Sequence, residues 1–148
     1  MSKNDEGAVT IQTHVEAPAT SVAAFIGDFR NAKEWMVGVE SVTKLAEEDY
    51  KLTLDSPVGK LEPEVRMLEH TEKEIRWKYT STIGGGGQVE VVPTGQRSCT
   101  ITYTGEFTLK QRLLGRLARA AGMNHFARKN GERSLERLKH LMEARRYA

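Results

Sequence analysis

Cysteine is nearly absent from this chain, which has 148 residues and one cysteine, Cys99. A single cysteine excludes an intramolecular disulfide, and it also excludes a metal site built from several thiolates. A chain that needs no disulfide suits a reducing compartment, so we expect a cytoplasmic protein.

Long apolar runs are also missing. No stretch of about 18 apolar residues is present to span a membrane. The first residues, MSKNDEGAVTIQ, lack the apolar segment of a secretory signal peptide. We therefore expect no transmembrane segment and no secretory signal.

Motifs for catalysis or metal binding are few. The four histidines form no H-x-x-x-H or H-E-x-x-H pair, and no serine lies in a G-x-S-x-G context. The run Gly84–Gly87 is not followed by the Lys-Ser/Thr of a phosphate loop. We expect no metal ion and no cofactor, and the catalytic residues of any reaction are unknown at this stage.

The composition is otherwise that of a globular protein, with 39% hydrophobic and 28% charged residues. The length suffices for one domain with a sizeable core, and no repeat or linker divides the chain. We predict a single domain over residues 1–148, with the polar residues 1–7 frayed.

The charges are distributed unevenly. From Lys110 onward there are 11 basic and 3 acidic residues, whereas the preceding part has 11 basic and 17 acidic residues. This basic segment is either a solvated face or a surface for anionic lipid or nucleic acid. We favour the solvated face and expect no nucleic-acid partner. The basic stripe consists of Arg112, Arg116, Arg119, Arg133 and Arg137.

Alternation of apolar and polar residues predicts a half-buried strand over Ala8–Glu16. Two short helices are predicted next, over Ser21–Asp28 and Asn31–Glu34. Short turns then separate six further strands, which predicts an antiparallel meander. In this interpretation Gly84–Gly87 is a turn, or a flexible hairpin beside a pocket. The six strands are Val39–Ala46, Tyr50–Asp55, Gly59–His70, Glu74–Thr82, Gln88–Pro93 and Ser98–Lys110.

Each predicted strand has one apolar face, so one face of the sheet must be covered by helices. The inward face is expected to carry Leu52, Leu54, Val65, Met67, Ile75, Trp77, Tyr79, Val89, Val91, Cys99, Ile101, Tyr103 and Phe107.

A long amphipathic helix is predicted over residues 111–145, which contain no proline. Its apolar stripe has large residues at both ends, Leu114 and Leu117 at one and Leu135, Leu138 and Met142 at the other. The middle of the stripe is small or polar. This pattern favours a cavity under the middle of the helix, although the same residues would suit contact with solvent or a loop.

The predicted fold is therefore α+β, with a seven-stranded antiparallel sheet curved around the long C-terminal helix and two short helices after the first strand. This order resembles the helix-grip fold of the START-like and polyketide cyclase/dehydrase (SRPBCC) superfamily. The resemblance rests on Val15-Glu16-Ala17-Pro18 with Val22 and Phe25, on Asp28–Asn31 with Glu34-Trp35-Met36 and Gly38-Val39, and on the final helix from Gly115 through Lys139.

The resemblance implies a cavity between sheet and helix that holds a small apolar molecule. Tyrosine hydroxyls on the inward face can hydrogen-bond a ligand, or they pair with backbone or water. Trp35 either packs on the ligand or seals the short helices to the sheet, and Arg128 either orients an anion or turns outward. The candidate ligand-binding residues are Trp35, Trp77, Tyr79, Tyr103, Asn124, Ala127, Arg128 and Gly131.

Three functions remain open from the sequence. The first is binding of a small hydrophobic ligand such as a lipid, a quinone or a polyketide-like molecule. The second is a cyclase or aromatase that uses Tyr79, Tyr103 or Arg128 to polarise a carbonyl. The third is an interaction module that uses the basic helix face. Phe126 either turns inward through a kink at Gly122 or lies exposed at a homodimer or membrane contact.

Overall fold

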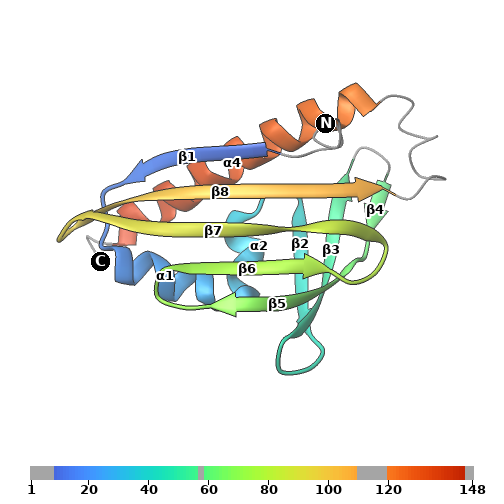
Figure 1. Ribbon diagram of the computed structural model, residues 1–148, viewed down its shortest axis with the longest axis horizontal. Helices are drawn as coiled ribbons and strands as arrows, with labels where there is room; N and C mark the ends of the chain where they lie inside the picture. Colours follow the sequence, from blue (N-terminus) through green and yellow to red (C-terminus); the bar gives the residue numbers. More distant parts are fainter. Residues whose placement is uncertain (1–8, 57–58, 110–119, 146–148) are drawn as a thin grey trace.

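The computed structural model describes residues 9–56, 59–109 and 120–145. A curled antiparallel sheet packs against the long C-terminal helix, and the first short helix packs against strands in the middle of the sheet (Figure 1). The elements are β1 (Val9–Val15), α1 (Ala19–Gly27), η2 (Phe29–Asn31), α2 (Ala32–Trp35), β2 (Val39–Lys44), β3 (Asp49–Ser56), β4 (Gly59–Leu61), β5 (Glu64–His70), β6 (Glu74–Tyr79), β7 (Ile83–Gly95), β8 (Ser98–Leu109) and α4 (Ala120–Arg145).

The strands form one sheet in the order β1-β8-β7-β6-β5-β3-β2, and the short β4 pairs with β3 beside this path. All pairs are antiparallel, and β1 joins the meander through β8 rather than through its neighbour in the sequence. Figure 1 shows β2 and β3 running across the direction of β5–β8, which curls the sheet toward α4. The predicted helix-grip fold is confirmed.

Two strand predictions were wrong, and the first concerns Gly59–His70. This stretch forms two strands, β4 and β5, with a break at residues 62 and 63. Pro63 has no N–H to donate to the sheet, so a continuous strand would lose a hydrogen bond there. The Pro63 carbonyl still accepts a bond of 3.0 Å from the Leu52 N–H, so the break stays attached to β3.

The second correction concerns Gly84–Gly87, which is neither a turn nor a hairpin tip. All four glycines lie within β7, and the turn precedes them at Thr80–Thr82, where Thr82 has a positive φ of 73°. Glycine is required inside the strand because a Cβ at Gly86 would clash with the Trp77 carbonyl, and one at Gly87 with the Trp77 ring.

The core lies between the inward face of the sheet and the helices. The inward residues of β3 and β5–β8 are buried or half-buried as predicted, except that the side chain of Phe107 lies outside the described part. Phe29 is buried beside Trp77 and Tyr50, with ring centroids 5.5 and 5.4 Å apart. From α4 the core receives Leu135, Leu138 and Met142, which are at most 3% exposed.

The C-terminal half of α4 is tied to β1 by polar contacts as well. Lys139 Nζ donates to the His14 carbonyl at 3.1 Å, and the Glu16 N–H donates to Glu143 Oε2 at 2.9 Å. Lys139 also pairs with Glu143 at 2.7 Å. The end of the helix is therefore fixed on the sheet edge.

The described part of α4 begins at Ala120. The predicted start of the helix near residue 111, with Leu114, Leu117 and three of the five stripe arginines, lies outside the described residues. Among the described helices, none is long and apolar enough to cross a membrane.

Candidate functional site

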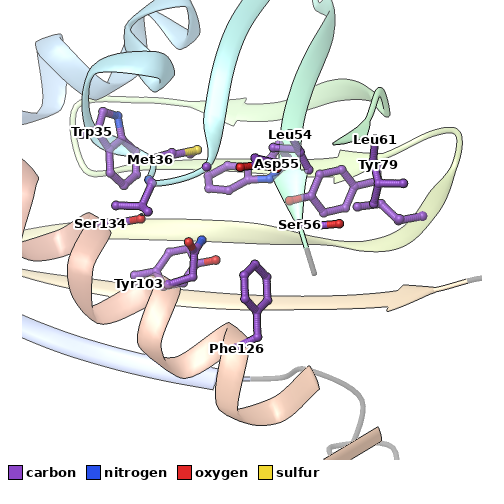
Figure 2. A pocket seen from close by; sticks show the side chains of 15 residues that line it. Trp35, Met36, Leu54, Asp55, Ser56, Leu61, Tyr79, Tyr103, Phe126 and Ser134 are labelled. Atoms are coloured by element: carbon purple, nitrogen blue, oxygen red, sulfur yellow. The ribbon is translucent and has the colours of Figure 1, made fainter. Parts of the chain in front are cut away.

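A pocket of about 80 Å³ lies between α4, the inward face of the sheet and the connection from α2 to β2 (Figure 2). Three groups of side chains line it, besides Gly38. The aromatic group is Trp35, Trp77, Tyr79, Tyr103 and Phe126; the aliphatic group is Met36, Val37, Leu54, Leu61 and Ile83; the polar group is Asp55, Ser56, Asn130 and Ser134.

Two glycines make room for the aromatic side chains on the sheet. Gly87 pairs with Trp77 on one side and with Gly105 on the other, so the three residues form one row across β6, β7 and β8. The Trp77 ring lies against Gly87, and the hydroxyl end of Tyr103 lies against Gly105. A Cβ at either glycine would occupy the space of the ring, so the missing side chains allow both rings to lie along the sheet.

The tyrosine hydroxyls are held away from solvent. Burial raises the pKa of Tyr79, although the nearby Trp77 indole N–H partly counteracts this by favouring the phenolate. Burial also raises the pKa of Tyr103, and the neighbouring Tyr79 adds to the effect. Both side chains therefore stay protonated at neutral pH and are available as hydrogen-bond donors. Figure 2 shows both hydroxyls directed toward the interior of the pocket.

The Trp77 indole nitrogen is a further polar group of the sheet-side wall. Trp77 is 3% exposed, and its Nε1 has no hydrogen-bond partner among the described residues. The Trp77 N–H lies close enough to the Tyr79 hydroxyl to lower the pKa of that hydroxyl, but the two groups do not reach the geometry of a hydrogen bond.

The helix contributes one face to the pocket, made by Phe126, Asn130 and Ser134. These residues are spaced by four, so they lie one above another on α4. Phe126, whose direction the sequence left open, points into the pocket (Figure 2).

Three predicted helix residues are placed elsewhere. Ala127 is buried at 5% exposure and Gly131 packs closely against Ile11 and Tyr103, so both belong to the seam between α4 and the sheet. Of the two alternatives left open for Arg128, the structure shows the outward one: its side chain is exposed and lies 3.8 Å from Glu132. The reason is rotation along the helix, because position 128 lies about 200° from position 126.

Of the remaining candidates, Trp35, Trp77, Tyr79 and Tyr103 all line the pocket. Trp35 is 1% exposed, so it also seals α2 onto the core, and both of its expected roles are compatible with its position. The side chain of Asn124 lies outside the described part of the chain.

The connection from α2 to β2 forms one side of the pocket and is attached at two points. The Val37 N–H donates to Ser134 Oγ at 2.9 Å, and the Gly38 carbonyl accepts from the Asp55 N–H at 2.8 Å. Gly38 has a φ of 97°, which favours glycine, and a Cβ there would lie 3.2 Å from the Asp55 carbonyl. The connection is therefore held to both α4 and β3.

The pocket offers little charge. Besides the tyrosines, Asp55 is the only ionisable side chain among the described lining residues, and it is exposed. Within the described ranges, no group of three or more His, Cys, Asp or Glu residues is placed to hold a metal ion. The arrangement suits an apolar molecule that receives hydrogen bonds.

Phe126, Asn130 and Ser134 were not predicted from the sequence as a set. Their spacing of four residues was visible, but the larger apolar stripe beside them drew the cavity prediction to positions 124, 127, 128 and 131. A second stripe of one aromatic and two small polar residues, next to an apolar seam, was the available signal.

Comparison with known proteins gives one family. The profile described as polyketide cyclase / dehydrase and lipid transport matches residues 6–143. No curated protein matches the sequence significantly.

Solved structures give the same fold. A START superfamily protein from Mycobacterium smegmatis has a TM-score of 0.78 at 15% identity, over 93% of this chain and 97% of the other. Zhui aromatase/cyclase from a Streptomyces species has a TM-score of 0.75 at 15% identity, over 93% and 94%. A protein from Thermus thermophilus has a TM-score of 0.75 at 19% identity, over 93% and 97%.

Proposed function

The chain belongs to the polyketide cyclase/dehydrase and lipid transport family, and from this premise we propose that it binds a small apolar molecule in the pocket under α4. The observation that carries the proposal is the pocket wall itself. Five aromatic side chains lie beside a few polar groups, among them the buried Ser134, which is the usual composition of a small-molecule site.

The size of the pocket limits what it can enclose. A volume of about 80 Å³ is smaller than the pockets of drug-sized ligands, which span about 300–1,000 Å³. The bound group is therefore a single ring, a short chain or one end of a larger molecule. A lipid, a quinone or a polyketide-like molecule would present such an end.

A pocket-filling substitution tests the proposal. Leu54→Trp places a larger ring into the lining, and it should lower the affinity for small aromatic probes at least about tenfold by occupying their space. Leu68→Trp is the matched control, because Leu68 is 42% exposed and is not among the pocket-lining residues. Binding is measured by calorimetry or native mass spectrometry. Equal binding by both variants would reject the pocket as the site.

A second candidate is a cyclase or aromatase reaction in the same pocket. It is favoured by the protonated hydroxyls of Tyr79 and Tyr103, which can polarise a carbonyl as negative charge develops on its oxygen. The described lining residues include no buried carboxylate or histidine that could act as the base of such a reaction. Turnover of a polyketide-like substrate that survives Tyr103→Phe would remove this residue from the mechanism.

Contact of the basic helix face with an anionic surface has weaker support. Of the basic stripe, only Arg133 and Arg137 lie in the described part of α4, where both are exposed, and Arg112, Arg116 and Arg119 lie outside the described residues. Binding to anionic vesicles that falls steeply with salt would be required to favour it.

A further inference from the structure

We propose that the molecule bound in this pocket is uncharged and carries a carbonyl oxygen, which accepts a hydrogen bond from the Trp77 indole N–H. The inference rests on the proposed function and adds the chemical class of the ligand. It is carried by three observations: an unpartnered buried donor, two tyrosine hydroxyls beside it, and the scarcity of charge in the pocket wall.

The first observation is the state of Trp77 Nε1. The residue is 3% exposed and lines the pocket, yet its N–H has no partner among the described residues. A buried N–H without an acceptor is unfavourable because it has lost its hydrogen bond to water. An indole nitrogen only donates, so the ligand atom that satisfies it must be an acceptor.

The second observation is the pair of hydroxyls. Tyr79 lies next to Trp77 Nε1, and Tyr103 lies near Tyr79. Both remain protonated and line the same pocket, so each is a further donor for an oxygen of the ligand. A carbonyl oxygen has two lone pairs and no hydrogen of its own that would need a partner.

The third observation concerns charge. No lysine, arginine or histidine is among the described lining residues, and the exposed Asp55 contributes a negative charge at the edge of the pocket. Arg128, which could have balanced an anion, is turned outward toward Glu132. A carboxylate in this pocket would be desolvated without a counter-ion. A neutral ketone, quinone or ester therefore fits better than the head group of a fatty acid.

Three probes of similar shape separate these properties. Acetophenone has a carbonyl, isopropylbenzene replaces it with a hydrocarbon branch, and benzoate replaces it with a carboxylate. Each is titrated into the full chain while the indole N–H signals are followed by ¹H–¹⁵N correlation spectroscopy. The sequence has two tryptophans, so Trp77→Phe assigns the signal, and Trp35→Phe assigns it by elimination should the first variant fail to fold.

Acetophenone should move the Trp77 indole proton downfield and bind roughly two- to tenfold more tightly than isopropylbenzene, the range of one added hydrogen bond. Benzoate should bind more weakly than acetophenone. In Trp77→Phe, the affinity for acetophenone should fall relative to the affinity for isopropylbenzene, because only acetophenone loses a hydrogen bond.

The outcomes separate the two proposals. If isopropylbenzene binds as tightly as acetophenone and the Trp77 indole signal shows no downfield shift, the carbonyl inference is overturned and the pocket still binds apolar molecules. If benzoate binds as tightly as acetophenone, the uncharged ligand is overturned. If no probe shifts any pocket resonance, both the inference and the proposed function fail.

Discussion

The indole ring of Trp77 lies against the α-carbon of Gly87, its partner on the next strand. A Cβ at position 87 would lie 2.7 Å from Trp77 Cε2 and closer still to Cζ2, so the strand tolerates only glycine without rearrangement. The glycine run therefore has a packing role, and the position of the ring that lines the pocket depends on it.

Gly87→Ala should destabilise the protein by about 1–3 kcal/mol, because the new methyl group must displace the Trp77 ring from a packed position. The free energy of unfolding in urea measures this change. The indole N–H signal of Trp77 should shift in the same variant, because the ring moves.

Gly84→Ala is the matched control for that substitution. Gly84 lies in the same strand, and a Cβ there would meet only Thr108, at 3.8 Å, which is ordinary contact. The free energy of unfolding of Gly84→Ala should change by no more than about 0.5–1 kcal/mol in either direction. An increase would arise because alanine restricts the backbone of the unfolded chain. Equal destabilisation by both alanines would contradict the role assigned to the Trp77–Gly87 contact.

Ser134→Ala should cost about 1–2 kcal/mol, because the Val37 N–H loses its acceptor on α4. Ser134 is 6% exposed, so the site gives water little access to replace the lost oxygen. Ser41→Ala removes an exposed hydroxyl that contacts Thr53, and it should change stability by less than about 0.5 kcal/mol. The free energies of unfolding of the two variants are compared in the same denaturant and buffer. If Ser134→Ala leaves the free energy of unfolding unchanged, the α2–β2 connection does not depend on this hydrogen bond.

Stability should fall in alkaline solution because of Tyr79 and Tyr103. Burial raises both pKa values in the folded state above the ordinary value near 10. Above that pH the unfolded chain releases these protons while the folded chain keeps them. The free energy of unfolding is therefore unaffected by these groups below about pH 10. Above it, the free energy decreases by up to about 1.4 kcal/mol per pH unit for each tyrosine.

Urea unfolding from about pH 8 to about pH 11 measures this slope. The double variant Tyr79→Phe/Tyr103→Phe should lose the part of the decline that these two side chains cause. Parallel pH profiles for the wild type and the double variant would contradict the assignment.

Much of the fold could be predicted from the sequence, because the spacing of apolar residues distinguishes strands from helices and identifies their buried faces. Alternating residues identified the inward faces of the strands, including Ile101 and Cys99, and the helical spacing of Leu135, Leu138 and Met142 identified the buried side of α4. The errors arose where a residue has two possible roles. Gly84–Gly87 satisfies the rule for a turn, but the contacts that explain Gly86 and Gly87 come from Trp77 on another strand.

The candidate site was predicted in part. The aromatic residues on the sheet followed from strand alternation, which fixes the face of each side chain once the register is known. The helix residues did not, because a rotation of one position on α4 exchanges Phe126 for Ala127 in the pocket, and the turn of a helix about its own axis is set by packing with the whole sheet. The small stripe residues Ala127 and Gly131 instead allow close approach at the seam.

The residues of α4 that pack against the sheet differ from most of those that line the pocket. Substitutions at Leu135 or Leu138 change whether the chain folds, because these side chains are almost fully buried. Substitutions at Phe126 or Asn130, which are only half-buried, change the shape and polarity of the pocket at smaller cost to folding. The shape and polarity of the pocket can therefore change by a few replacements on one side of the helix, while the residues that hold the helix to the sheet stay the same.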